Sequence, residues 1–185
     1  MMFVSLGMGV VIATVMITIV SVLTPSGKTT TTTSTVPPSS LVGRVVAQTP
    51  LTLIGGPRAH HVVSFPERGQ ASVLFFFSST CTECQVELPR LAKWIQSGTI
   101  PDTAHPTFVD AVDVTTDGLA LLSSSNIPST ATVVADPAGD MTTGKFGFMG
   151  VPYTVFVNRH GVVTSVVAGA VSLAKIQAGI RTILG

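Results

Sequence analysis

A short apolar segment that leads directly into a helical pattern constrains the fold of this chain most. Residues 71–77 read Ala-Ser-Val-Leu-Phe-Phe-Phe, with Arg-Gly-Gln before them and Ser-Ser-Thr after them. A run of this length and composition predicts a strand that is buried on both faces. Beyond it, Leu88, Leu91 and Ile95 recur at helical spacing, and Pro89 is expected to kink the helix. The chain therefore passes from a central strand straight into a helix.

The residues after this helix continue to alternate between strand and helix patterns. We expect strands at 108–114 and 131–135, a helix at 116–126, a hairpin of strands 153–158 and 162–168, and a final helix at 172–184. Strands joined by helices run parallel, whereas a hairpin adds antiparallel strands. The pattern predicts an α/β fold, a three-layer sandwich with a central mixed β-sheet and helices on both faces.

The amino-terminal region differs from the rest of the chain. Residues 3–23 contain neither a charge nor a proline, and as a helix they would extend about 30 Å, enough to cross a bilayer. We expect one transmembrane helix in residues 1–23, an anchor or signal-anchor; a cleaved signal peptide and a buried soluble helix are the alternatives. Residues 24–40, rich in Thr, Pro and Ser, predict a disordered linker. Residues 41–185 then form the folded domain.

The charge balance excludes one class of partner. The chain has 10 Lys+Arg and 9 Asp+Glu, a formal net charge of +1, so no basic surface for nucleic acid is expected. A zinc site that uses the two cysteines would need a second pair of Cys or His ligands at a similar spacing. The four histidines do not show this spacing: His60, His61, His105 and His160. We expect no metal and no cofactor.

The two cysteines of the chain, Cys81 and Cys84, stand where the central strand gives way to the helix. The positive end of a helix stabilises a thiolate and lowers a cysteine pKa from about 8.5 to roughly 3.5–7.5. Glu83 between them should hold the pKa of Cys81 higher than a neutral residue would. Cys81 is thus the candidate nucleophile and Cys84 the resolving thiol. A structural disulfide is the alternative, although so short a loop adds little stability.

Two segments resemble a known family. Residues 75–89 read Phe-Phe-Phe-Ser-Ser-Thr-Cys-Thr-Glu-Cys-Gln-Val-Glu-Leu-Pro, and residues 146–161 contain Gly-Val-Pro-Tyr-Thr-Val-Phe-Val-Asn. Both resemble the thioredoxin superfamily, in particular its membrane-anchored TlpA-like and ResA-like thiol–disulfide oxidoreductases, which are related by fold to the AhpC/TSA alkyl hydroperoxide reductases. The resemblance implies a thioredoxin-like fold for residues 41–185.

The resemblance also implies roles for six residues. Cys81 and Cys84 would form a redox-active disulfide, and Glu87 would be a catalytic residue that transfers protons. The remaining three would bind substrate beside a cis Val-Pro bond: Val151, Pro152 and Thr80. The sequence departs from the family at Thr80, where many relatives have tryptophan, and at Phe75, where cytoplasmic thioredoxins have a buried aspartate.

These features predict a membrane-tethered thiol–disulfide oxidoreductase. It would exchange disulfides with protein cysteines, be recharged by a membrane or extracytoplasmic redox partner, and serve redox homeostasis or cytochrome c maturation. A stable disulfide cycle needs an oxidising compartment or a dedicated electron supply across the membrane, so we expect a single-pass protein of the cell membrane with its catalytic domain outside the cytoplasm. The alternatives are a thiol peroxidase, with Ser78 supplying a hydroxyl near a peroxidatic Cys81, and a non-catalytic binding domain that keeps the fold.

Overall fold

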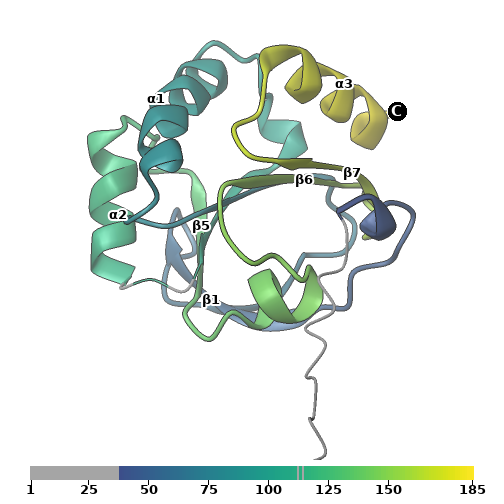
Figure 1. Cartoon of the computed structure of the whole chain (residues 1–185), viewed down its shortest axis with the longest axis horizontal. Helices are drawn as coiled ribbons and strands as arrows, with labels where there is room; N and C mark the ends of the chain where they lie inside the picture. Colours follow the sequence, from purple (N-terminus) through teal and green to yellow (C-terminus); the bar gives the residue numbers. More distant parts are fainter. Residues whose placement is uncertain (1–37, 112, 114) are drawn as a thin grey trace, which may run out of the picture. The chain divides into compact units, whose positions relative to one another are not determined.

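The computed structural model describes residues 38–111, 113 and 115–185. A mixed β-sheet forms the centre of this part of the chain (Figure 1). In chain order its strands are β1 (Thr49–Gly55), β2 (Val62–Phe65), β3 (Ser72–Phe77), β4 (Pro106–Ala111), β5 (Thr132–Asp136), β6 (Tyr153–Val157) and β7 (Val163–Ala168). Across the sheet their order is β2-β1-β5-β4-β3-β6-β7. The predicted central strand therefore lies inside the sheet, between β4 and β6.

The strand directions follow the pattern of the connections. β3, β4 and β5 are mutually parallel, whereas the β6–β7 hairpin is antiparallel and pairs with β3 in the antiparallel sense. The mixed sheet is thus confirmed. No strand is predicted before residue 71, yet β1 and β2 extend the sheet beyond β5 as an antiparallel pair. Their burial alternates or is weak, which is typical of strands near a sheet edge.

The three α-helices all pack on one face of the sheet (Figure 1). They are α1 (Thr82–Gln96), α2 (Thr115–Ser124) and α3 (Leu173–Leu184). The crossovers from β3 to β4 and from β4 to β5 step in the same direction, so right-handed connections place α1 and α2 on the same side. Gly179 of α3 lies so close to the ring of Phe156 that a Cβ at this position would overlap it.

The opposite face has a different cover. A π-helix, η3 (Asp140–Lys145), and a 3-10 helix, η1 (Pro38–Leu41), lie on this side together with a short aromatic cluster. Phe76 of β3 meets the rings of Phe146 and Phe148 edge-on, both at centroid distances of 5.2 Å. Helical segments therefore cover both faces, but the expected second layer of α-helix is replaced by short helices and aromatic rings. A further 3-10 helix, η2 (Asp102–Ala104), precedes β4.

Residues 43–46 attach to the far end of the β6–β7 hairpin. The Gly43 N–H donates to the Val163 carbonyl at 2.8 Å, and the Val46 N–H donates to the Gly161 carbonyl at 2.9 Å. The Arg68 guanidinium joins the same region by donating to the carbonyls of His160, at 2.6 Å, and Val46, at 2.8 Å. The first part of the folded domain is thereby fixed at the turn between β6 and β7.

The predicted transmembrane helix in residues 1–23 lies outside the described residues, as does most of the predicted linker. The last three positions of that linker, 38–40, belong to η1 together with Leu41. Within residues 38–111, 113 and 115–185, no helix has the length and apolar character needed to cross a membrane. The anchor and the linker both stay predictions.

Candidate active site

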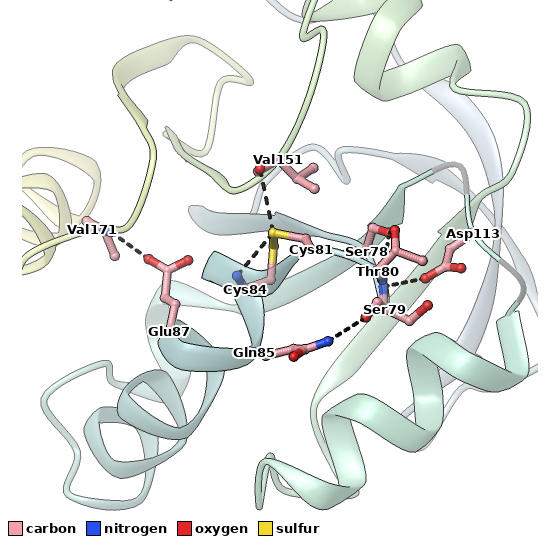
Figure 2. Close-up of a disulfide and its surroundings, with 10 residues drawn as sticks. All are labelled: Ser78, Ser79, Thr80, Cys81, Cys84, Gln85, Glu87, Asp113, Val151 and Val171. Carbon is pink, nitrogen blue, oxygen red and sulfur yellow. Dashed lines mark hydrogen bonds between the residues drawn. A yellow bond between two sulfur atoms is a disulfide. The ribbon is translucent and has the colours of Figure 1, made fainter.

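The cysteine pair lies where β3 ends and α1 begins, as predicted. Cys81 is the N-cap of α1, and its Sγ accepts the Cys84 N–H at 3.0 Å. The two cysteines form a disulfide with their Cα atoms 5.2 Å apart (Figure 2). Cys84 is completely buried, whereas Cys81 is partly exposed. Cys81 is therefore the more exposed of the two cysteines, and its sulfur lies at the positive end of a helix.

The Val151–Pro152 segment lies directly beside this disulfide. The peptide bond between these residues is cis, which confirms the expectation from the family resemblance. The Val151 carbonyl oxygen is 3.6 Å from the Cys81 Sγ, while Pro152 is buried (Figure 2). Residues 70 positions apart in the chain are thus brought into contact at the reactive sulfur. A second cis bond, Phe65–Pro66, was not anticipated.

Residues 78–80, which link β3 to Cys81, are held by side chains on both sides. The Ser79 N–H donates to the Asp113 carboxylate, and the Gln85 Nε2 donates to the Ser79 carbonyl at 3.0 Å (Figure 2). Thr80 is exposed, and its hydroxyl lies 3.0 Å from the Ser78 Oγ. The Ser78 hydroxyl suggested for a peroxidase is therefore engaged by Thr80. We call residues 78–80 the active-site loop.

Glu87 lies one turn beyond Cys84 and is buried, with only 4% of its surface exposed. Its Oε1 accepts the Val171 N–H at 2.5 Å, and its carboxylate is directed toward Val171 (Figure 2). Burial raises the pKa of Glu87, an effect that the Val171 hydrogen bond and the Arg90 charge oppose. The side chain is therefore a buried acid one helical turn from Cys84, and it also joins α1 to the segment before α3.

Asp110 is a second buried acid, which the sequence analysis did not single out. It lies at the end of β4 with 2% of its surface exposed, and neither carboxyl oxygen has a hydrogen-bond partner. Burial, with smaller contributions from the charges of Asp113 and Asp117, raises the pKa of Asp110 to about 7. No group of acidic, His or Cys side chains within the described ranges could hold a metal ion. The sequence signal that could have identified Asp110 is its position as a charged residue within an otherwise uncharged strand.

An uncharged groove of about 300 Å³ begins beside the cis Val-Pro bond. Eight residues line it: Ser78, Ala111, Thr142, Thr143, Phe148, Met149, Gly150 and Val151. Met149 is 65% exposed, so a flexible apolar side chain forms part of its rim. The surface next to the partly exposed sulfur is therefore suited to uncharged groups.

The strand order, the disulfide at the start of α1 and the cis proline beside it define a thioredoxin-like α/β fold. Solved structures with a similar backbone include a disulfide oxidoreductase, the thioredoxin domain of a thiol-disulfide oxidoreductase and a thioredoxin-like superfamily protein. No protein-family model matches the sequence, and no curated protein matches it. The similarity to solved structures therefore rests on the arrangement of the backbone.

Three solved structures illustrate this similarity. DsbF from MTB, solved in mixed oxidized and reduced forms, is 23% identical with a TM-score of 0.62, covering 74% of this chain and 96% of that one. StoA from Bacillus subtilis is 18% identical with a TM-score of 0.60, covering 74% and 98%. A secreted Mycobacterium tuberculosis disulfide oxidoreductase homologous to E. coli DsbE is 17% identical with a TM-score of 0.59, covering 73% and 96%.

The raised pKa of Asp110 predicts a pH-dependent stability. Below about pH 4 the carboxyl is protonated in both the folded and unfolded states; as the pH rises toward 7, only the unfolded state releases the proton, so the folded state loses stability. At pH 8 we expect Asp110→Asn to be more stable than wild type by about 2–4 kcal/mol, with a much smaller difference at pH 5. Urea unfolding of the oxidised full-length protein in mild detergent measures this. An equal difference at both pH values would contradict it.

Proposed function

We propose that this chain is a thiol–disulfide oxidoreductase that exchanges disulfides with protein cysteines through Cys81 and Cys84. One observation carries the proposal: the partly exposed Cys81 caps a helix, its disulfide partner is fully buried, and the carbonyl of a cis Val-Pro segment lies 3.6 Å from the Cys81 Sγ. This arrangement exposes one reactive atom to a substrate and shields the other. The thioredoxin-like fold and its oxidoreductase neighbours support the same activity.

The exchange proceeds in two displacements. A substrate thiolate attacks the Cys81 Sγ, forming a mixed disulfide while the Cys81–Cys84 bond breaks and its electron pair passes to the Cys84 sulfur. A second substrate thiolate then attacks the substrate sulfur of the mixed disulfide and releases the Cys81 thiolate. The substrate loses two electrons and gains a disulfide, and the protein becomes a dithiol. The reverse sequence reduces a substrate disulfide.

The surroundings of Cys81 favour its role as the attacking and leaving thiolate. In the disulfide its Sγ already accepts the Cys84 N–H at 3.0 Å, and the same amide would donate to the thiolate after reduction. Hydrogen bonds and the positive helix end stabilise the charged form. The Val151 backbone beside it can pair with an extended substrate segment, as in strand addition. Thr80, exposed on the neighbouring loop, can contact the same segment.

Substitution of each cysteine tests the exchange activity. Cys81→Ala should reduce insulin disulfide exchange to the background rate, because the accessible nucleophile is lost. Cys84→Ala should accumulate a mixed disulfide on Cys81, because the resolving thiol is missing. Non-reducing gels and mass spectrometry of the trapped adduct measure both results. Full activity of Cys81→Ala would refute the proposal, and Ser97→Ala, on the exposed end of α1, serves as the unchanged control.

Glu87 is proposed as the group that gives a proton to the Cys84 sulfur when this buried sulfur leaves, and takes it back in the reverse reaction. Its burial and its position one turn beyond Cys84 support this role. Burial also keeps it protonated to a higher pH than an exposed glutamate. A buried thiolate without such a donor would be left charged in an apolar core.

Glu87→Gln should lower the exchange rate by about 100-fold, the lower end of the range for general acid–base catalysis. The amide oxygen can still accept the Val171 N–H, so the fold should be retained. Because Glu87 loses its proton as the pH rises through its pKa, the exchange rate of the wild type should decline over this range. The variant should not show this decline. Stopped-flow kinetics across pH 5–9 measure both effects, with Asp102→Asn, an exposed acid in η2, as the control. An unaltered profile would exclude the role.

The domain is further proposed to work outside the cytoplasm, held to the membrane by a helix in residues 1–23. The uncharged length of residues 3–23 supports the tether, and a secreted disulfide oxidoreductase among the similar structures supports the location. A membrane or extracytoplasmic redox partner would then recharge the cysteine pair. Protein thiols of that compartment, including those of cytochrome c maturation, are the proposed substrates.

Labelling of Cys81 tests this location. In the Cys84→Ala variant Cys81 is the single thiol, and a membrane-impermeant maleimide should label it in intact cells. The labelled protein should remain in the membrane fraction after a carbonate wash, because a transmembrane helix resists extraction. Labelling that requires cell lysis would contradict the orientation. A shortened protein in the medium would show that the segment is cleaved.

A further inference from the structure

The exchange chemistry makes no use of Asp110, a buried acid on the strand next to the one that leads into the active-site loop. In the parallel pairing of β3 with β4, Asp110 is in register with Phe77, the last residue before the loop. Phe77 belongs to the core on the α-helical face, together with Cys84 and Phe108. Since alternate residues of a strand share a face, Asp110 lies on the same face as Phe108 and near the cysteine helix.

The charged groups that act on Asp110 are both carboxylates. Asp113 follows in the segment after β4, and Asp117 belongs to the first turn of α2. The neighbours in register on β3 and β5, Phe77 and Ala135, carry no charge. Ionised Asp110 therefore meets repulsion from two sides, and neither of its oxygens has a hydrogen-bond partner to offset the loss of water.

Asp110 has little room to move away from these charges. Its carboxyl group lies against Gly118 of α2, so closely that a Cβ at position 118 would overlap it. Its backbone is fixed by the sheet on both sides. Asp113, by contrast, is only partly buried and lies outside any helix or strand. Its carboxylate accepts the Ser79 N–H, so the repulsion from ionised Asp110 acts on the same carboxylate that holds Ser79.

We propose that Asp110 is a positioning residue of the redox site: its charge controls how firmly Asp113 holds Ser79, and with it the loop that carries Cys81. The proposal rests on the exchange function proposed above. With Asp110 neutral, Asp113 holds the loop. With Asp110 ionised, the hold loosens and the added negative charge disfavours the Cys81 thiolate. The reactivity of a cysteine normally rises with pH because its thiol becomes a thiolate. Ionisation of Asp110 reduces this rise for Cys81.

Hydrogen exchange at the Ser79 amide tests the link to the loop. In oxidised full-length protein in mild detergent, its protection factor, corrected for the intrinsic pH dependence, should fall at least about fivefold from pH 6 to pH 8, the lower end of coupling between linked sites. Asp110→Asn should remove this fall. Asp102→Asn removes an exposed acid that is not among the charges acting on Asp110, and it should keep the fall. Equal pH dependence in wild type and Asp110→Asn would overturn the proposal.

Two further measurements keep the test decisive. Carbon-13 NMR of the wild-type protein measures the pKa of the Asp110 carboxyl without any substitution. A pKa near 4 would overturn the proposal. In reduced protein, the ratio of Cys81 alkylation rates between Asp110→Asn and wild type should rise at least about fivefold from pH 6 to pH 8. A constant ratio would contradict the link to reactivity. If wild type alkylates normally but exchanges no disulfides with insulin, the proposed function fails while the Ser79 result still decides the role of Asp110.

Discussion

The hydrogen bond from the Cys84 amide to the Cys81 sulfur is the contact on which the rest of the site depends. It exists because a strand buried at all six positions ends at Phe77 and the chain turns into α1 within a few residues. The sheet fixes the position of the strand, and the strand fixes the start of the helix. A sulfur at that start faces amide groups that have no partner within the helix. The position of the Cys81 sulfur therefore depends on the burial of the β3 side chains in the core.

Much of this could be predicted from sequence because the signals are local. The apolar run before Cys81, the helical spacing of Leu88 and Leu91, and the Val-Pro pair are each contained in a few residues. The alternation of strands and helices then restricts the topology, since parallel strands need crossovers of one hand. The structure agrees with these expectations at β3, α1 and the cis Val151–Pro152 bond.

Other features depend on contacts that no short segment encodes. β1 and β2 contain polar residues and a proline, and they become strands because each finds a partner at the sheet edge. The π-helix η3 begins where the Asp136 carboxylate accepts the N–H groups of Met141 and Thr142, at 3.1 and 2.7 Å. Asp110 appears ordinary in sequence, and only the packing of α2 over β4 removes it from water. Tertiary packing decides these cases.

The attachment of residues 43–46 to the β6–β7 turn also determines which side of the domain is free. Val151 lies just before β6, whereas Gly161 and Val163 lie at the other end of that hairpin, a strand length of roughly 15 Å away. The polypeptide that leads into the domain is therefore secured at the pole remote from the disulfide. Within the described residues, this first attached segment therefore leaves the surface around the disulfide uncovered.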